Sequence, residues 1–371
     1  MDKLKVNTRC YDLTSLDEAQ QEEVFAQAGA VIRRGGTVVF PTETVYGLGA
    51  DAMKAESVHS IYQAKGRPSD NPLIIHVADF DLSGIALEVP PQAERLMKKY
   101  WPGPLTIILK KDPRVPQETT GSLNTVGVRM PDQPVALALI KASGTVIAAP
   151  SANISGRPSP TTYERCRQDL EGRVDMILGM DQSRVGLEST IIDLSGEVPE
   201  LLRPGAVTLE ELRKDLGEVI YRPSESLQGD QTPRAPGMKY RHYAPKAPVT
   251  LFQGNPEQVR DHMLKEREEN TLLIFIDREI MKGFTNKKSL RQRPLNQSLQ
   301  AEKHSRNLGT WLVHFKSVEE AAQGIFETLR RADDQEAEAV WIQTIPEQGL
   351  GLSLMNRLKK AAAYKIKEVS K

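Results

Sequence analysis

The amino-acid sequence predicts an α/β protein built from two domains, and three observations support this prediction. The chain has 371 residues, whereas a domain commonly holds about 100 to 200. Hydrophobic residues make up 39% and charged residues 26%, the composition of an ordinary globular protein. Short apolar runs alternate with amphipathic segments on both sides of one Pro-rich stretch. This alternation is typical of α/β folds.

The first domain is expected to form one sheet of seven strands with helices between them. An amphipathic segment at 17–34 starts the pattern, and another helix is expected at 55–64. The predicted strands are 37–40, 73–77, 105–110, 125–130, 145–149, 174–178 and 189–194. Capping boxes, in which a hydroxyl and a later Glu bond each other's backbone N–H groups, indicate three helix starts. They are Thr161 with Glu164, Thr208 with Glu211, and Ser317 with Glu320.

The segment 222–248 is a linker by composition, because it is rich in Pro, Gly, Ser and Gln and shows no sustained period. A second α/β pattern follows it, and a compact, mostly parallel three-layer domain fits this pattern. Its strands are predicted at VTLF after the linker, 271–276, 311–315 and 339–343, and its helices at 256–268, up to 331, and from 351. The predicted domains are therefore 1–221 and 249–371.

Charge and composition exclude several classes of protein. Lys plus Arg equals Asp plus Glu at 49 each, so no global field attracts nucleic acid or an anionic membrane. The opening segment lacks a signal-peptide core, and no apolar run approaches the roughly 20 residues that span a bilayer. These features predict a cytoplasmic protein without a membrane partner. Cys10 and Cys166 lie far apart and lack metal-ligand spacing, so neither a disulfide nor a zinc site is expected.

The stretch 40–52 begins at the end of a predicted strand and contains hydroxyls, one tyrosine and two glycines. Loops at strand ends are where α/β proteins bind ligands. Thr42 and Thr44 would share one side of an extended segment, while Gly47 and Gly49 would allow close backbone approach. A turn with a solvated polar tip is an equally good interpretation of these residues alone.

The stretch 65–77 brings two cations close together. Lys65 and Arg67 could converge on a polyphosphate, Arg through its fork and Lys as a point charge. A cationic helix C-terminus is the alternative, because such residues complement the helix dipole. His76 lies in an alternating strand, where a histidine usually has a structural role.

Two further segments carry polar residues at strand ends. Arg129 lies in an otherwise apolar strand on the same face as Thr125 and Gly127, so it needs an anion, either a ligand or a salt-bridge partner. The loop 148–161 offers backbone amides and hydroxyls to phosphate or ribose, although it could also be a long turn. Ser189 and Arg203 lie at the edges of predicted strands.

Common nucleotide-binding and hydrolase motifs are absent. The dipeptide Gly-Lys does not occur, which excludes a Walker A loop, and G-x-G-x-x-G, H-E-x-x-H and G-x-S-x-G are missing as well. No nucleophile with its base is evident. The sequence therefore favours catalysis by positioning and electrostatics.

Taken in order, these segments resemble the YrdC-type threonylcarbamoyl-AMP synthase family in its two-domain form. The resemblance rests on PTETVYGLG, KGRPSDNPLIIHV, WPGPLTIIL, VGVRMP, APSANISGRPSPT, ESTIIDL, LLRPGA, the linker motif PGMKYRHYAP and the later GLGLSLMNRLKKAA. It implies a twisted mixed sheet with helices around a concave cleft, and a smaller Rossmann-like C-terminal domain. It also implies that the linker 222–248 acts as an active-site lid.

The resemblance implies an enzyme that joins L-threonine, bicarbonate and ATP into L-threonylcarbamoyladenylate and pyrophosphate, with Mg²⁺ held by the ATP phosphates. The product would serve N6-threonylcarbamoyl modification of tRNA through downstream transfer proteins. The implied ATP residues are Lys65, Arg67, Asn71, Thr125, Ser151, Asn153, Ser159, Arg203 and Tyr240. The residues that the resemblance implies for binding L-threonine are Thr42, Thr44, Tyr46, His76, Arg129, the backbone of Ala149, and Ser189. The implied catalytic set is Lys65, Arg67, Tyr240, His242 and Tyr243, the last three closing the site.

Two other functions fit parts of the sequence. The stretch 282–306 holds seven Lys or Arg against one acidic residue, so weak tRNA or double-stranded RNA binding is an alternative to a solvated loop. A carbamoyl-transferring relative in metallocentre maturation would need a Cys-rich zinc-finger segment. The two cysteines of this chain cannot supply one.

Overall fold

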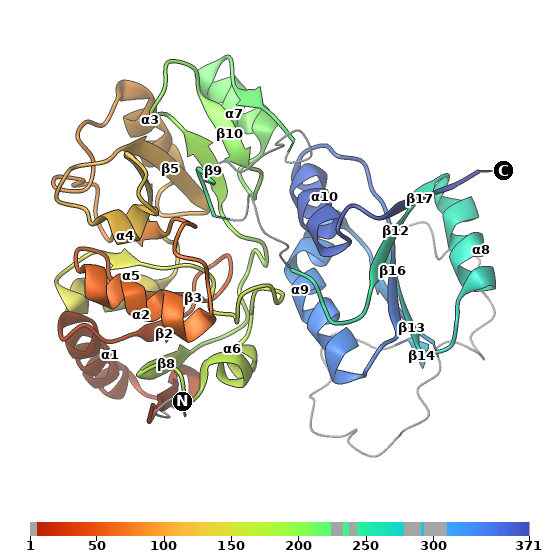
Figure 1. Cartoon of the computed structure of the whole chain (residues 1–371), viewed down its shortest axis with the longest axis horizontal. Coiled ribbons are helices and arrows are strands. Elements are labelled where there is room, and N and C mark those ends of the chain that lie inside the picture. The colour runs from red at the N-terminus through yellow and green to blue at the C-terminus, as the bar shows by residue number, and fades with distance from the viewer. Residues whose placement is uncertain (1–5, 224–232, 237–242, 278–290, 293–309, 371) are drawn as a thin grey trace. The chain divides into compact units, whose positions relative to one another are not determined.

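The computed structural model describes residues 6–223, 233–236, 243–277, 291–292 and 310–370. The chain divides into two compact units, which are shown in Figure 1. Unit 1 comprises Met1–Ser155 and Ser159–Tyr240, and unit 2 comprises Gly156–Pro158 and Arg241–Lys371. Each unit has its own sheet.

Unit 1 contains an eleven-stranded mixed sheet in the order β1-β8-β2-β3-β7-β4-β6-β5-β9-β10-β11. Its strands are β1 (Arg9–Asp12), β2 (Val38–Phe40), β3 (Gly47–Asp51), β4 (Ile74–His76), β5 (Leu105–Lys110), β6 (Thr125–Arg129), β7 (Ile147–Ala148), β8 (Met176–Gly179), β9 (Thr190–Asp193), β10 (Glu200–Arg203) and β11 (Ile220–Tyr221). All seven predicted strands are present, most of them shorter than predicted, but the expected number was too low, because β1, β3, β10 and β11 were not predicted. The expected twisted mixed sheet with helices is confirmed.

Strand β3 was predicted as part of a loop, and this prediction was wrong. Its sequence contains two glycines and no β-branched residue, so local propensity does not favour a strand. Tertiary pairing overrides that propensity: β3 pairs antiparallel with both β2 and β7. A Cβ atom on Gly49 would lie 2.6 Å from Ile147 Cγ2, which explains why the strand carries glycine there.

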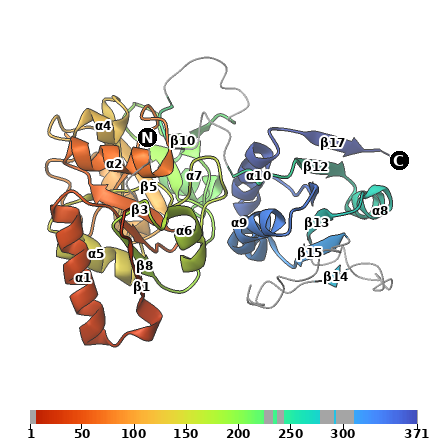
Figure 2. The ribbon, with the colours of Figure 1, turned by 60° about the horizontal axis from the view of Figure 1, so that its bottom comes forward.

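Helices cover the sheet of unit 1. They are α1 (Glu18–Arg33), α2 (Ala55–Lys65), α3 (Pro91–Tyr100), α4 (Gln117–Thr120), α5 (Pro134–Ser143), α6 (Tyr163–Leu170) and α7 (Leu209–Leu216). Helices α1 and α5 pack together at one end of the sheet, as Figure 2 shows. Their backbones approach closely, because a Cβ on Gly29 would lie 2.3 Å from the carbonyl oxygen of Ala142. Their apolar faces bury a core that includes Ile32, Phe40 and Leu139.

The capping predictions are confirmed in part. Thr208 and Glu211 form the predicted box at the start of α7. The prediction at Thr161 was wrong by one residue, since the N-cap of α6 is Thr162, whose hydroxyl accepts from the N–H of Arg165.

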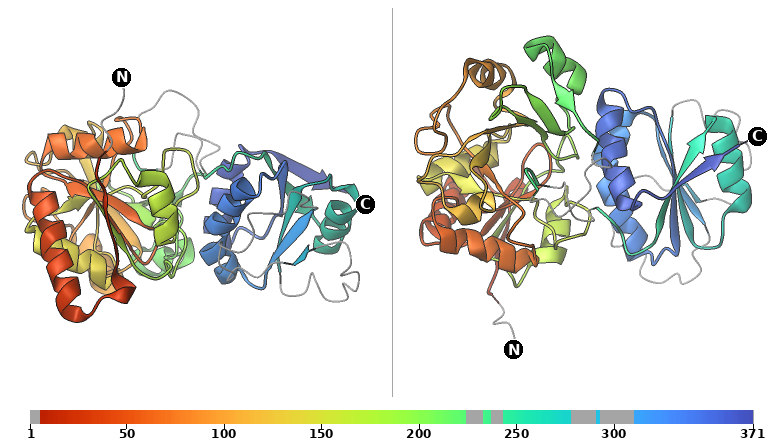
Figure 3. Two further views of the ribbon diagram at one scale, coloured as in Figure 1. Left: turned by 90° about the horizontal axis from the view of Figure 1, so that it is seen from below. Right: turned by 45° about the horizontal axis from the view of Figure 1, so that its top comes forward.

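Unit 2 contains a six-stranded sheet in the order β14-β15-β13-β16-β12-β17, and its described pairings are all parallel. The strands are β12 (Val249–Gly254), β13 (Thr271–Ile276), β14 (Arg291–Gln292), β15 (Trp311–Phe315), β16 (Ala339–Gln343) and β17 (Ile366–Val369). Helix α8 (Pro256–Glu266) covers one face, and α9 (Val318–Asp334) and α10 (Leu350–Ala361) cover the other, as Figure 3 shows. Ser317 caps α9 as predicted, but the capping box is incomplete, because the Glu320 carboxylate accepts from the N–H of Lys316 (2.6 Å) and not from that of Ser317. The predicted three-layer parallel domain is confirmed.

None of the helices in the described part of the chain combines the length and apolarity that crossing a membrane requires.

Candidate active site

The loop between β2 and β3 holds Thr42 and Thr44 in fixed, buried positions. The Thr42 hydroxyl donates to the carbonyl of Val45 (2.6 Å) and lies 2.8 Å from the Thr44 hydroxyl. The backbone N–H groups of Val185 and Gly186 donate to the carbonyls of this loop (2.7 and 3.1 Å). The two threonines therefore face the same side, as the sequence predicts, but they are packed and not solvated.

Tyr46 follows in the same loop, and its hydroxyl is occupied. It donates to the carbonyl of Met180 (2.7 Å) and accepts from the N–H of Met180 (3.0 Å). Burial raises the pKa of Tyr46 above its ordinary value. The phenol is thus a neutral structural group, and a contact of its ring with substrate stays a prediction.

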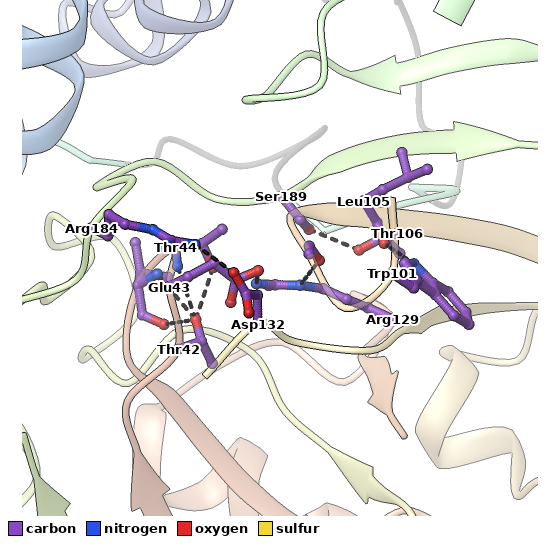
Figure 4. A network of polar contacts seen from close by, with 12 residues as sticks. Thr42, Glu43, Thr44, Trp101, Leu105, Thr106, Arg129, Asp132, Arg184 and Ser189 are labelled. Carbon is purple, nitrogen blue, oxygen red and sulfur yellow. Dashed lines mark hydrogen bonds and ion pairs between the residues drawn. The ribbon is translucent and has the colours of Figure 1, made fainter. Parts of the chain in front are cut away.

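Arg129, at the end of β6, has an anionic partner. Its guanidinium forms an ion pair with Glu43 (2.7 Å between nitrogen and oxygen), and both side chains are at most 4% exposed. The Nε–H of Arg129 donates to the carbonyl of Gly103 (3.2 Å). Figure 4 shows this pair between the Thr42–Thr44 loop and the hydroxyls of Ser189 and Thr106.

The Glu43 carboxylate has one oxygen to spare. Its Oε1 forms the ion pair with Arg129 Nη2, and within the described part of the chain its buried Oε2 has no hydrogen-bond partner. Buried polar atoms normally find partners, so unsatisfied ones require an explanation. The sequence indicates that Arg129 needs an anion but does not indicate that Glu43 supplies it. That residue was detectable as the one carboxylate within PTETVYGLG.

His76 lies beside this pair, because β4 and β6 are paired with His76 opposite Arg129. Its Nδ1 lies 3.2 Å from the carbonyl of Ile74, and its ring meets Phe40 edge-on at 6.0 Å. Burial, and then the charge of Arg129, lower the pKa of His76 to about 3. His76 is therefore neutral at physiological pH and can donate or accept a hydrogen bond without changing the charge of the site.

Lys65 is the last residue of α2, and only 1% of it is exposed. Its ammonium donates to the backbone carbonyls of Ser151 and Asn153, at 2.5 Å each. The Ser151 hydroxyl donates to Asn153 Oδ1 at 2.6 Å, which fixes this loop internally. Three predicted ATP residues are therefore in direct contact.

Arg67 and Asn71 lie just beyond α2, where Gly66 in the left-handed region ends the helix. Arg67 donates to the carbonyls of Asn71 (3.4 Å) and Pro72 (3.2 Å). Asn71 is buried, and its Oδ1 has no hydrogen-bond partner among the described residues. Arg67 is half-buried and Asn71 has a spare acceptor, so both are suited to bind a polar ligand.

Ser189 and Arg203 come together at β9 and β10. Arg203 donates to the carbonyl of Ser189 (2.9 Å) through Nε and to its hydroxyl (3.1 Å) through a terminal nitrogen. The Ser189 hydroxyl also lies 2.8 Å from that of Thr106 on β5, a residue that the sequence did not indicate. Arg203, which is predicted to bind ATP, thus contacts Ser189, which is predicted to bind L-threonine.

Ser159 and Thr125 are the remaining predicted ATP residues in the described part. The Ser159 hydroxyl donates to the buried carboxylate of Glu188 (2.6 Å), which the sequence did not single out. Thr125 lines a small hollow together with Thr106 and Gly127. Ala149, whose backbone was predicted to meet threonine, donates its N–H to the carbonyl of Ile74 (2.9 Å).

A short described piece of the linker, 233–236, is fastened to unit 1. Arg234 forms ion pairs with Glu200 (2.7 Å) and Asp193 (3.4 Å). Ala235 is fully buried in an apolar cluster with Ile74, Ile108, Ile191 and Leu202. Arg203 donates to the carbonyl of Pro236 (3.4 Å). The linker therefore contacts a residue of the predicted ATP set.

The proposed closing residues are only partly described. Tyr240 and His242 lie outside the described residues. Tyr243 is buried, and its ring stacks on Phe326 of α9 at 5.1 Å. A role of Tyr243 in closing the site stays a prediction.

The site residues share one region of the sheet of unit 1. Strands β3, β7, β4, β6, β5, β9 and β10 are neighbours in that order, and the described candidate residues in unit 1 lie on them, on the loops beside them or at the end of α2. The described residues contain no group of three or more His, Cys, Asp or Glu side chains that could hold a metal ion.

Comparison with known proteins gives the family. The Sua5, YciO and YrdC family model, described as "Telomere recombination", matches residues 30–205. The model of the threonylcarbamoyl-AMP synthase C-terminal domain matches residues 207–363. The chain is similar to threonylcarbamoyl-AMP synthases from Pyrococcus abyssi (43% identity, covering 92% of this chain and 95% of the relative) and Bacillus subtilis (41%, 92% and 93%). The relative from Schizosaccharomyces pombe is 36% identical, covering 94% and 90%.

Solved structures agree with this result. The crystal structure of Pyrococcus abyssi Sua5 complexed with L-threonine has a TM-score of 0.82 at 39% identity, covering 98% of this chain and 99% of that one. A structure of a variant of the same protein has a TM-score of 0.84 at 40% identity, with 98% coverage of both chains. The resemblance drawn from the motifs is confirmed, and the chain belongs to the Sua5/YciO/YrdC family in the two-domain form of the threonylcarbamoyl-AMP synthases.

Proposed function

We propose that this protein is an L-threonylcarbamoyladenylate synthase. It converts L-threonine, bicarbonate and ATP into L-threonylcarbamoyladenylate and pyrophosphate. The threonine amine and bicarbonate form a carbamate with loss of water, and the carbamate oxygen attacks the α-phosphate of ATP and displaces pyrophosphate. We assign catalysis to 1–221, closure to the linker 222–248, and a separate fold to 249–371.

One observation carries the proposal: the buried Arg129–Glu43 ion pair, with one carboxylate oxygen unpartnered, lies at β6, and only β4 separates β6 from β7, whose following loop is bound by Lys65. Arg129 suits the carboxylate of an amino acid, because a guanidinium binds a carboxylate through two parallel hydrogen bonds. Thr42, Thr44 and Ser189 supply hydroxyls around it. A complex with L-threonine is known for the similar Pyrococcus abyssi protein.

The residues that we assign to ATP are chosen by the charge that develops during the reaction. Attack on the α-phosphate develops negative charge there and on the leaving pyrophosphate, and fixed cations stabilise both. We assign this role to Arg67 and Arg203. Lys65 instead holds the Ser151–Asn153 loop by donating hydrogen bonds to the carbonyls of Ser151 and Asn153. Thr125 and the hollow it lines lie on the same side of β6 as Arg129.

Mg²⁺ would be bound through the phosphates of ATP, where it would neutralise their charge. The adenylate product is prone to hydrolysis, so exclusion of water is useful. We assign this task to the linker, which is fastened to unit 1 through Arg234 and Ala235. Tyr240, His242 and Tyr243 are its candidates for closing the site. We place the reaction in the cytoplasm, where transfer proteins would pass the threonylcarbamoyl group to the adenosine beside the anticodon in tRNAs reading ANN codons.

The test uses the pure full-length protein with ATP, magnesium, radiolabelled bicarbonate and each amino acid in turn. We expect a labelled nucleotide adduct and pyrophosphate with L-threonine. Equal labelling with all amino acids, or none with threonine, would contradict the proposal.

Direct RNA binding remains a prediction from the sequence. The basic stretch 282–306 lies outside the described residues except for 291–292. A salt-dependent tRNA gel shift without ATP would support it, since phosphate contacts weaken as salt rises.

A further inference from the structure

The buried pair of Glu43 and Arg129 places two opposite charges side by side beneath the Thr42–Thr44 loop. Their charged atoms are 2.7 Å apart, and the side chains are 2% and 4% exposed. A free α-amino acid also carries two opposite charges, a carboxylate and an ammonium, on atoms joined through one carbon. The pair and the amino acid are therefore electrostatic complements.

The carboxylate of Glu43 has unused hydrogen-bonding capacity. Its Oε1 lies 2.7 Å from Arg129 Nη2, whereas its buried Oε2 has no partner among the described residues, and a carboxylate can accept about four hydrogen bonds. Leaving such a buried group unsatisfied is costly unless a ligand supplies the missing donors. An ammonium offers three donors and a positive charge, whereas a hydroxyl offers a single neutral one.

The backbone of Glu43 is fixed in place for such a role. Its carbonyl accepts from the N–H of Val185 (2.7 Å), and the carbonyl of Thr44 accepts from Gly186 (3.1 Å). The buried Arg129 cation is the ion-pair partner of the Glu43 carboxylate (2.7 Å). A receptor arranged in advance loses little entropy on binding.

We propose, resting on the proposed function, that Glu43 binds the α-ammonium group of L-threonine while Arg129 binds its carboxylate. Glu43 thereby selects zwitterionic α-amino acids over 2-hydroxy acids of the same shape. It is a specificity-determining residue for the binding step. A purely structural Glu43, which only neutralises Arg129, would not distinguish these two kinds of ligand.

The experiment measures binding by calorimetry to the full-length protein. The ligands are L-threonine and 2,3-dihydroxybutanoate of matching configuration, in which a hydroxyl replaces the ammonium. We expect wild-type protein to prefer L-threonine by at least about 10-fold, because charge-assisted hydrogen bonds are the strong ones. In Glu43→Gln, threonine affinity should fall about 10- to 100-fold, while affinity for the hydroxy acid changes less than about 3-fold.

The matched control is Asp132→Asn. Asp132 pairs with Arg184 in the same region but is 48% exposed, so the same loss of charge there should leave the preference intact. Unchanged ATP binding shows that Glu43→Gln is folded.

The outcomes separate the two proposals. A wild-type protein that binds both ligands equally overturns the role of Glu43, whether or not the variant folds. So does a Glu43→Gln variant that binds threonine normally, or one that loses both ligands equally. A wild-type protein that binds neither ligand contradicts the proposed function itself.

Discussion

Lys65 and Arg67 are close in sequence, but the structure separates their roles. Lys65 is buried and donates to two backbone carbonyls of the Ser151–Asn153 loop, whereas Arg67 is half-buried near the carbonyls of Asn71 and Pro72. From the sequence alone, both alanine variants are expected to fold normally. The contacts of Lys65 change that expectation for one of them.

We expect Lys65→Ala to lower the free energy of unfolding by about 2–4 kcal/mol, because two charge-assisted hydrogen bonds are lost and their acceptors stay buried. Arg67→Ala should change it by less than about 1 kcal/mol. Both should reduce threonine-dependent pyrophosphate release by about 100-fold or more. Urea unfolding and a pyrophosphate assay measure the two quantities. Equal stability of the two variants would refute a structural role for Lys65.

His76 gives the fold a pH dependence. Its pKa is lowered to about 3 in the folded chain, while an unfolded histidine titrates near pH 6.5. Between these values the unfolded chain binds one more proton, so acid favours unfolding. The stability contributed by neutral His76 is complete above about pH 6.5 and is lost as the pH falls towards 3.

We therefore expect the unfolding free energy of wild-type protein to fall more steeply with acid than that of His76→Asn. The difference should approach about 1.4 kcal/mol per pH unit between pH 6 and 4. The side-chain amide introduced by this substitution can still donate to the carbonyl of Ile74, so the two proteins differ mainly in whether the side chain titrates. Parallel pH profiles from urea titrations would show that His76 is not buried as described.

At the scale of elements, the strands with runs of β-branched residues could be predicted, and β3 could not. The physical reason is that β3 is stabilised by its partners β2 and β7, and sequence patterns register local preference only. The polar residues of the site follow the same rule. The sequence indicates that Arg129 needs an anion, but the choice of Glu43 depends on how the loop after β2 meets β6.

The turn after β10 offers a test of close backbone packing. A Cβ atom on Gly205 would lie 2.4 Å from the backbone nitrogen of Thr190, whereas one on Gly196 would meet nothing within 4 Å. Gly205→Ala must therefore move the end of β10, which carries Arg203. We expect it to cost about 1–3 kcal/mol of stability and to weaken ATP binding. Gly196→Ala should change neither the free energy of unfolding nor the affinity for ATP. If Gly205→Ala also left both unchanged, the packing described would be contradicted.

At the scale of the whole molecule, the linker has a described anchor on unit 1. Arg234 pairs with Glu200 and Asp193, and its neighbour Ala235 is fully buried. We expect Arg234→Glu to lower adenylate formation, because the new carboxylate repels both partners and releases Pro236 from Arg203. The measurement is threonine-dependent pyrophosphate release.

The matched control is Arg167→Glu, an arginine of the same exposure (45% against 44%) that pairs with one carboxylate on α6. It should leave activity unchanged. Equal activity of the two variants would mean that the anchor at 233–236 does not contribute to the reaction.

The order of strands in unit 1 has a consequence for protein synthesis. Some strands far apart in the sequence, such as β1 and β8 or β5 and β9, are neighbours in the sheet, and the groups assigned to substrates range from Thr42 to Arg203. A chain still emerging from the ribosome therefore lacks part of the pocket until more than half of it has been translated. On the proposed assignment of the site residues, an unfinished copy would be unable to consume ATP, and activation of threonine would begin only in a chain made at least as far as Arg203.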